Sequence, residues 1–412
     1  MTTTNTISLT YGTEGRLSLE VDPERVVTSH GHVDEVPDIR LAVRTALERP
    51  LEYPPVDLAV VPGDRITIAL DRHTPRSSEI IAEVWAMLEG RGVTAEDVFI
   101  LQPVGMDGRR LSDPRSLLPD DVRTLVRWGV HDPTDKSRQC YLASTSTGER
   151  IYLARELVDA DFVLPIGEMT YDPVLGIRGT SSVFFPGMST VEAIDKARGE
   201  GHWELSPEDD RPLRQVMDEI GWLLGIQVTL QVLSSSGTGV AEVICGTLDA
   251  VGTAGRQALA NHWRVEQDEH ADIVVVAVDA DSAGHGWQQV GQALESAQHL
   301  VSRHGTIVVL SQIDELPGPG LRLLNGRRKA SEALRTLRKQ MPPDLVSTSQ
   351  LVHAVDWARV YLMSRLPADL VEELFLIPLE TDREIEKLLS GTGSISFISS
   401  AQHTFGHVGS TV

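Results

Sequence analysis

The feature that most constrains the fold is an alternation of short apolar runs with helix-forming segments. RITIALD (65–71) and DVFILQP (97–103) are continuous apolar runs of strand length. The segment between them (76–92) has helical spacing, with serines near its start and a glycine at its end. A further run, DFVLPIGEM (161–169), follows later in the chain. Strands that alternate with helices form βαβ units, so the sequence predicts an α/β fold with mostly parallel sheets.

The same alternation begins again in the last third of the chain. ADIVVVAVD (271–279) has the pattern of a buried strand, and a helix and the strand TIVVLSQ (306–312) are expected to follow it. The segment 249–263 reads as a connecting helix. We therefore expect two α/β domains with helical connectors, residues 1–258 and residues 259–412, and a cleft between the domains.

Charge and cysteine content narrow the classes of partner and compartment. The formal net charge is −22 over 412 residues, which disfavours nucleic acid and anionic membranes as partners. A small-molecule anionic ligand at a local positive site is the expected partner, and the oligomeric state is left open. The chain has only two cysteines, no signal-peptide pattern at its start and no apolar run of about 18 residues. These features favour a cytoplasmic protein.

Polar and charged residues follow the expected strands. Because ligands of parallel sheets bind beyond the carboxyl ends of the strands, these residues are candidates for one site. Each of them also fits an ordinary turn or helix cap. The candidates are Asp71, His73, Thr74, Arg76, Asp107, Glu168 and Asp172. The carboxylates among them would suit Mg²⁺ or paired acid/base chemistry if they lie close together.

The segment GIRGTSSVFFPGM (176–188) is a second candidate, because closely spaced glycines let the backbone approach a ligand. Arg178 lies beside this backbone and suits a phosphate or carboxylate. By contrast, His403 and His407 have the i,i+4 spacing of metal ligands but fall in a Gly/Ser-rich end of the chain. We interpret them as part of a solvated tail.

The order of these segments resembles the lactate racemase family, whose members use a nickel-pincer nucleotide to racemise 2-hydroxy acids. The resemblance includes the Tyr-Gly start, TALERPLEYPPVD, the strand that ends in an Asp-x-x-Thr loop, the Gly-rich loop closed by Pro-Gly, and the WQQ helix followed by a strand. It implies the two-domain α/β fold and places the cofactor cradle in residues 1–258. If the chain is an active member, it is an isomerase; whether it is an enzyme is left open.

Carried onto this sequence, several family positions hold other residues. In the strand-end loop, Asp71 is kept and Thr74 stands at the arginine position, with Arg76 close by. Two family histidines, one of them a catalytic acid/base, correspond to Asp107 and Asp172.

The cofactor positions diverge as well. The lysine that the family joins covalently to its cofactor corresponds to Ser182, and the nickel-ligating histidine corresponds to Arg198. In the second domain Gln288 is kept, Trp287 replaces a tyrosine, and Gly291 replaces a lysine. The remaining cradle positions are Gly176, Arg178 and Gly179.

A serine hydroxyl cannot replace the amine of that link, and a guanidinium does not ligate nickel. The resemblance implies a nickel-pincer nucleotide, but we expect it not to be covalently bound and no metal to be held. Three hypotheses follow. The chain is a divergent member with a degenerate active site that binds a hydroxy acid or nucleotide; or an active 2-hydroxyacid racemase or epimerase that binds the cofactor non-covalently; or a carboxylate- or Mg²⁺-dependent enzyme in the same cleft.

Overall fold

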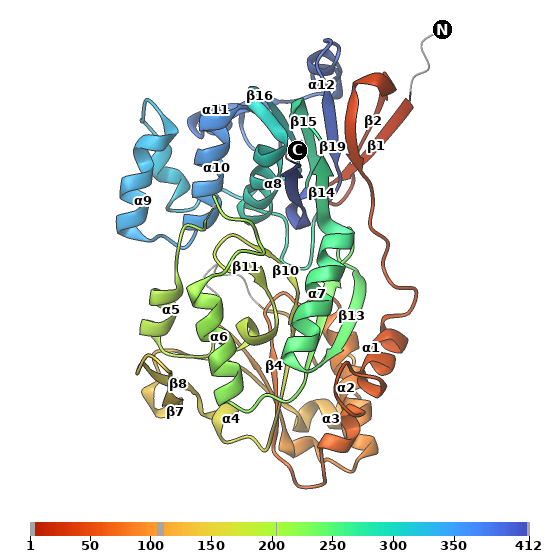
Figure 1. Ribbon diagram of the computed structural model, residues 1–412, viewed down its shortest axis with the longest axis vertical. Helices are drawn as coiled ribbons and strands as arrows, with labels where there is room; N and C mark the ends of the chain where they lie inside the picture. The colour runs from red at the N-terminus through yellow and green to blue at the C-terminus, as the bar shows by residue number, and fades with distance from the viewer. Residues whose placement is uncertain (1–4, 105–110, 203, 410–412) are drawn as a thin grey trace. The chain divides into compact units, whose positions relative to one another are not determined.

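The protein is described by a computed structural model that covers residues 5–104, 111–202 and 204–409. It divides into two compact units (Figure 1). The central unit comprises residues 34–198 and 204–260, and the terminal unit comprises the described parts of 1–33, 199–203 and 261–412.

The limits of these units differ from the expected domains at the start of the chain. The terminal unit resumes at Asn261, close to the expected limit, but it also contains residues 1–33. The reason is that β3 (Val26–His30) pairs in parallel with β19 (Ile395–Ile398) and so completes the sheet of that unit.

The central unit is built on a six-stranded sheet in the order β13-β12-β9-β4-β5-β6. All neighbours pair in parallel except β13, which is antiparallel to β12. The strands are β4 (Ile66–Leu70), β5 (Val98–Gln102), β6 (Arg127–Val130), β9 (Phe162–Glu168), β12 (Thr229–Ser234) and β13 (Val240–Gly246). Two hairpins complete the unit: β7 (Gln139–Ser144) with β8 (Arg150–Ala154), and β10 (Thr170–Asp172) with β11 (Gly176–Arg178).

Helices surround this sheet. They are α1 (Ile39–Glu48), α2 (Ser77–Gly90), α3 (Asp120–Leu125), α4 (Arg155–Val158), α5 (Val191–Ala197) and α6 (Pro212–Leu223). Every residue of β4, β5 and β9 is buried, which explains why these strands are continuous apolar runs in the sequence. One apolar cluster packs α1 and α2 against the sheet, and another contains residues of β8, α4 and α6.

The terminal unit is built on a second six-stranded sheet in the order β18-β17-β16-β15-β19-β3, with all neighbours parallel. Its further strands are β15 (Ala271–Ala277), β16 (Val301–Leu310), β17 (Arg359–Met363) and β18 (Ile377–Leu379). Its helices are α8 (Trp287–Leu300), α9 (Leu334–Gln340), α10 (Leu345–Trp357), α11 (Ala368–Glu373) and α12 (Asp382–Leu389). The hairpin of β1 (Asn5–Tyr11) and β2 (Gly15–Val21) belongs to this unit and packs against its sheet, and α7 (Leu248–Trp263) leads into the unit. The predicted α/β fold with mostly parallel sheets is confirmed.

Three local predictions are corrected. The pattern of DPRSLLPDDVRTLVRWG (113–129) predicts one helix, but only α3 is α-helical there, and Arg127 begins β6, which pairs with β5. The pattern of GWQQVGQALESAQHLVSRHG (286–305) predicts one long helix, but α8 ends at Leu300 and β16 begins at Val301. The end of the chain is not a solvated tail, because β20 (Phe405–Val408) pairs with β14 (Arg264–Gln267) and His403 is only 6% exposed. Within the described ranges, no helix combines the length and the apolar character needed to cross a membrane.

Candidate functional site at the carboxyl edge of the central sheet

The parallel strands of the central sheet end along one edge, and each of them presents a polar residue there. In sheet order these residues are Ser234, Glu168, Asp71, Gln102 and His131. Asp71 follows β4 directly, and its backbone N–H bonds to the carbonyl of Ile166 in β9 at 2.8 Å. Edges of this kind bind ligands in open α/β sheets, so this row defines the candidate site.

Arg178 on β11 links the two acidic residues of the row. Its Nε lies 3.8 Å from Asp71 Oδ2, and its Nη2 lies 3.7 Å from Glu168 Oε2. The side chains are 27%, 13% and 8% exposed, in the order Arg178, Asp71 and Glu168. The sequence alone indicates an external anion as the partner of Arg178; in the structure it faces two internal carboxylates.

Glu168 is the most unusual titratable group of the site. Burial raises the pKa of its carboxyl, and the nearby guanidinium of Arg178 and the Ser234 hydroxyl oppose this effect. The hydroxyl of Ser234, at the end of β12, donates to Glu168 Oε1 at 2.5 Å. Asp71 raises the pKa of Glu168 further, and His73 lowers it. Glu168 is thus a carboxyl that gains protons more readily than a solvated glutamate does.

The loop after β4 is organised around Asp71. The Oδ1 of Asp71 accepts from the backbone N–H of Arg72 at 2.8 Å, and the buried Thr74 hydroxyl donates to the Asp71 carbonyl at 3.1 Å. Arg76 has a left-handed backbone (φ 55°) just before α2 and pairs with Glu35 at 2.9 Å and Glu79 at 3.6 Å. The Thr74 hydroxyl therefore makes a hydrogen bond within the loop, and the Arg76 guanidinium forms ion pairs with two carboxylates.

Of the other predicted acidic residues, Asp172 does not add to this site. Asp172 caps the turn between β10 and β11, because its Oδ1 accepts from the backbone N–H groups of Val174 at 2.9 Å and Leu175 at 2.8 Å. Asp107 lies outside the described residues. Among the residues that the structure describes, no three His, Cys, Asp or Glu side chains are grouped as metal ligands.

The Gly-rich loop packs against this edge with little room for side chains. Gly176 and Gly179 have positive φ values of 74° and 125°. A Cβ on Gly176 would lie 2.3 Å from the carbonyl oxygen of Pro207, and a Cβ on Gly179 would lie 2.4 Å from Met169 Sδ. The glycines are thus required by the backbone conformation and by close packing.

The Ser182 hydroxyl is used within the loop itself. It accepts from the backbone N–H of Gly179 at 2.8 Å and donates to the Gly179 carbonyl at 3.1 Å. Arg198, at the end of α5, lies 3.4 Å from Asp195. Neither side chain offers the amine or the imidazole that the resemblance assigns to its position.

Arg214 on α6 holds the loop from behind, and sequence reasoning missed it. Its Nη1 donates to the carbonyls of Ile177 at 3.1 Å and Gly179 at 3.2 Å, and its Nη2 donates to the Thr180 hydroxyl at 2.5 Å. An arginine on a distant amphipathic helix carries no local signal of this role.

Gln231 and His131 were also missed. The side chain of Gln231 on β12 is fully buried, its amide donates to Thr229 at 2.8 Å, and its Oε1 accepts no hydrogen bond among the described residues. His131 follows β6, donates from Nε2 to the Ser189 carbonyl at 2.7 Å, and has its pKa lowered by burial. Because the sequence pattern predicts a helix over 127–129, it does not reveal His131 as a strand-end residue.

Trp287 and Gln288, two further predicted site residues, belong to the terminal unit. Trp287 begins α8, is buried, and donates from its indole to the Glu315 carbonyl at 2.9 Å. Gln288 is exposed, whereas its neighbour Gln289 is buried and accepts from the Gly286 N–H at 3.0 Å. Gln289 thus takes the structural role at the start of this helix.

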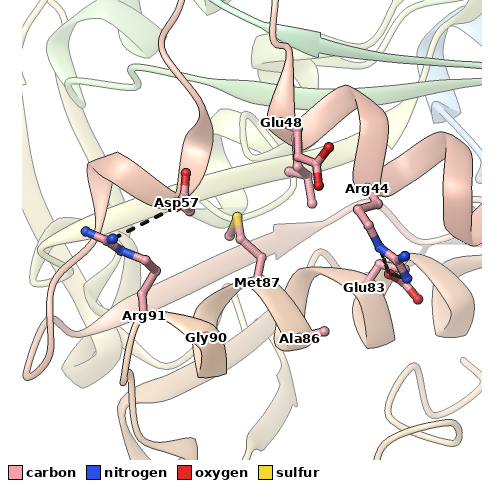
Figure 2. A pocket seen from close by; sticks show the side chains of 9 residues that line it. Arg44, Glu48, Asp57, Glu83, Ala86, Met87, Gly90 and Arg91 are labelled. Atoms are coloured by element: carbon pink, nitrogen blue, oxygen red, sulfur yellow. Dashed lines mark hydrogen bonds and ion pairs between the residues drawn. The ribbon is translucent and has the colours of Figure 1, made fainter.

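A separate hollow of about 330 Å³ lies between α1 and α2 in the central unit (Figure 2). Four of its charged groups are already paired: Arg44 with the buried Glu83 at 2.9 Å, and Arg91 with Asp57 at 4.0 Å. Met87 lies between the two pairs in Figure 2. The hollow has no Gly-rich loop and no strand-end residues, so we place the candidate site at the sheet edge instead.

The fold and the edge define a class: a protein of two α/β units, each with a mostly parallel sheet, in which a Gly-rich loop of one unit packs against a row of strand-end polar residues. Comparison with known proteins finds a matching domain in the first part of the chain. Residues 11–200 match the family model of the lactate racemase N-terminal domain. Over these residues the chain is similar to the lactate racemase family. No curated protein matches the sequence.

Two solved structures share the fold. The lactate racemase apoprotein from Thermoanaerobacterium thermosaccharolyticum is 16% identical, with a TM-score of 0.79 over 97% of this chain and 99% of that chain. A Thermotoga maritima protein from a structural genomics programme is 13% identical, with a TM-score of 0.62 over 92% of this chain and 100% of that chain. At these identities the likeness establishes the fold.

Proposed function

We propose that this chain is a lactate-racemase-like protein without nickel-pincer catalysis, and that it binds a small anionic ligand, a hydroxy acid or a nucleotide, at the carboxyl edge of the central sheet. The observation that carries this proposal is the Ser182 hydroxyl, which is bonded to the Gly179 N–H and carbonyl at the position of the family's cofactor lysine. The residues present do not fit a covalently held nickel-pincer nucleotide. The free thiols of Cys140 and Cys245 agree with a reducing, cytoplasmic location.

The chemistry of the edge favours a hydroxy acid among these ligands. Arg178 offers a guanidinium to a carboxylate, and Asp71 and Glu168 beside it accept a hydroxyl hydrogen. The raised pKa of Glu168 also lets this residue take a proton when an anion approaches, which limits the repulsion between ligand and site.

The first experiment tests the loss of the cofactor. The chain is co-expressed with the enzymes that build the nickel-pincer nucleotide, and the purified protein is examined by metal analysis and intact mass. A functional lactate racemase produced in the same cells is the control. We expect no stoichiometric nickel and an unmodified mass. Nickel bound without added mass would support a non-covalent racemase instead, and added mass would overturn the proposal.

The second experiment tests ligand binding. Melting is followed with lactate, with larger 2-hydroxy acids, with a nucleoside monophosphate and with propionate, which lacks the hydroxyl. A ligand that binds only the folded state raises the melting temperature with its concentration. We expect a hydroxy acid to do so and Arg178→Met to abolish the effect, while Arg65→Met, in the exposed pair with Asp161, leaves it unchanged. Equal shifts in both variants would place the ligand elsewhere, and a shift with Mg²⁺ alone would favour a cation-dependent enzyme.

A further inference from the structure

The terminal sheet has a reversal of strand order that the proposed function does not use. From β15 the chain passes through α8 to β16 and then to β17 and β18 on one side, whereas β19 lies on the other side of β15 (Figure 1). In open parallel sheets, ligands bind outside the carboxyl ends of strands at such a switch point. The ends of β15 and β19 are therefore the place to search for a second site.

Buried polar residues meet at this switch point. Asp279 follows β15, Ser400 follows β19, and the Ser400 hydroxyl donates to Asp279 Oδ2. Asp281, with a side chain 6% exposed, accepts through Oδ1 from the Ala283 N–H at 2.8 Å and from the Gln289 amide at 3.2 Å. Two carboxylates are thus fixed at the reversal by their own hydrogen bonds.

Two buried donors or acceptors beside them lack hydrogen bonds. Gln402 Oε1 accepts from the Asp279 N–H at 3.2 Å, which fixes the orientation of the amide, yet Gln402 Nε2 is buried without a hydrogen-bond partner among the described residues. His403 Nε2 is likewise buried without a hydrogen-bond partner among the described residues, and Asp281 Oδ2 lies 4.0 Å from it. The two residues are 3% and 6% exposed. Buried polar groups without partners are uncommon and mark a place where a water or a ligand belongs.

The chemistry of these groups selects the ligand class. Burial lowers the pKa of His403 to about 4, so its imidazole is neutral at pH 7. The site then holds two carboxylates and neutral donors, which repels phosphates and carboxylates. The indole of Trp263, 5.0 Å from the His403 ring between ring centres, adds an apolar wall. A ligand with two adjacent hydroxyls matches these groups. One hydroxyl donates to the Asp281 carboxylate, and the other accepts from the Gln402 amide.

We propose that the switch point between β15 and β19 binds a neutral vicinal diol of the kind found in a ribose ring, held by Gln402, His403 and Asp281. In other doubly wound sheets, a carboxylate beyond the strand ends accepts a hydrogen bond from a ribose hydroxyl in the same way. This site lies within the terminal unit and does not depend on the hydroxy-acid proposal for the central unit.

The probes are methyl β-D-ribofuranoside and its 2-deoxy analogue, which differ only in the diol. Full-length protein labelled with ¹⁵N-histidine is titrated with each, and the imidazole signals of His403 are assigned by substitution. We expect the riboside to shift the His403 Nε2 signal and the deoxy analogue to bind about tenfold more weakly or not at all, because a buried hydrogen-bonding group would be left unpaired.

Variants locate the effect. Asp281→Asn keeps one acceptor oxygen, and Gln402→Met removes the unpaired amide; we expect both to lose about tenfold in affinity. Gln350→Met is the matched control. Gln350 is a buried glutamine on α10 of the same unit, and its amide donates to Glu295 on α8 at 2.6 Å. If Gln402→Met does not fold, Asp281→Asn and the two probes on the natural protein still decide. No shift of His403 with the riboside would mean that water alone fills the site, and equal binding of both probes, or a loss in the Gln350 variant, would also overturn the proposal.

Discussion

Arg178 Nη2 lies 3.7 Å from Glu168 Oε2, and that carboxylate is almost completely removed from solvent. The same guanidinium lies 3.8 Å from Asp71, so one cation serves two acids on adjacent parallel strands. Removing one partner of a buried pair leaves an uncompensated charge, which costs more than the pair itself contributes. The stability of the central unit therefore depends on Arg178 in a testable way.

Replacing Arg178 with methionine is expected to lower the free energy of unfolding by about 1–3 kcal/mol at pH 7. The expected loss is at the lower end for a buried pair because Arg178 is partly exposed. Urea unfolding followed by circular dichroism measures it. Adding Glu168→Gln to the same chain should restore part of the loss, because the amide carries no charge. A double variant less stable than Arg178→Met would show that the loss comes from packing and not from the buried carboxylate.

The pH dependence of Glu168 follows from the direction of its pKa shift. Burial raises the pKa of this carboxyl above 4.5, so the folded state holds its proton after the unfolded state has released it. The contribution of Glu168 to stability is thus complete below pH 4.5 and is lost as pH rises through the raised value. We expect the urea midpoint of Glu168→Gln, relative to the natural protein, to increase from pH 4.5 upward. A constant difference across this range would contradict the raised pKa.

Much of the fold was predictable, because strands buried on both faces must be apolar throughout. RITIALD, DVFILQP and DFVLPIGEM match β4, β5 and β9 within a residue or two. The partnership of β3 with β19 was not predictable, since these strands lie more than 360 residues apart and nothing local in VVTSH identifies a neighbour. For the same reason, the burial of His403 was missed: its polar surroundings in the sequence conceal the pairing of β20 with β14.

The site was predictable only in part. The position of Asp71 and Glu168 at one edge follows from parallel pairing of their strands, which the βαβ pattern indicates. The sequence alone predicts an external anion as the partner of Arg178. It does not reveal that β11 places this residue beside Asp71 and Glu168. Arg214 acts through contacts across the fold, and Gln231 is buried in the sheet and bonds to Thr229 on the same strand. Neither residue belongs to a motif.

Gly179 is expected to tolerate no side chain. Its φ of 125° is unfavourable for any L-residue, and an alanine Cβ would lie 2.4 Å from Met169 Sδ. Gly179→Ala should therefore lower the free energy of unfolding by about 2 kcal/mol or more. Gly90→Ala is the matched control: Gly90 ends α2, and a Cβ added there would meet nothing within 4 Å, so little change is expected. Equal melting temperatures for the two variants would mean that the Gly-rich loop is not held in this conformation.

Arg214 is expected to keep the Gly-rich loop in place. Its guanidinium makes three hydrogen bonds to Ile177, Gly179 and Thr180, and an ion pair to Asp218 at 3.3 Å keeps it aligned along α6. Arg214→Ala removes all of these bonds, so the Ile177 carbonyl loses this donor while the Gly179 carbonyl keeps its bonds from Ser182. Amide hydrogen exchange over 176–183 should therefore become about tenfold faster or more, while the exchange of β4 and β9 stays unchanged.

The control is Arg155→Ala, which removes an exposed ion pair with Asp159 on α4, 3.8 Å long and outside the loop. If both variants left the exchange of 176–183 unchanged, the loop would be held by its glycines and by the Ser182 bonds alone. If Arg214→Ala accelerated exchange and also weakened hydroxy-acid binding, the conformation of the loop would be coupled to the Asp71–Arg178–Glu168 edge, because Arg178 itself lies on β11 at the start of that loop.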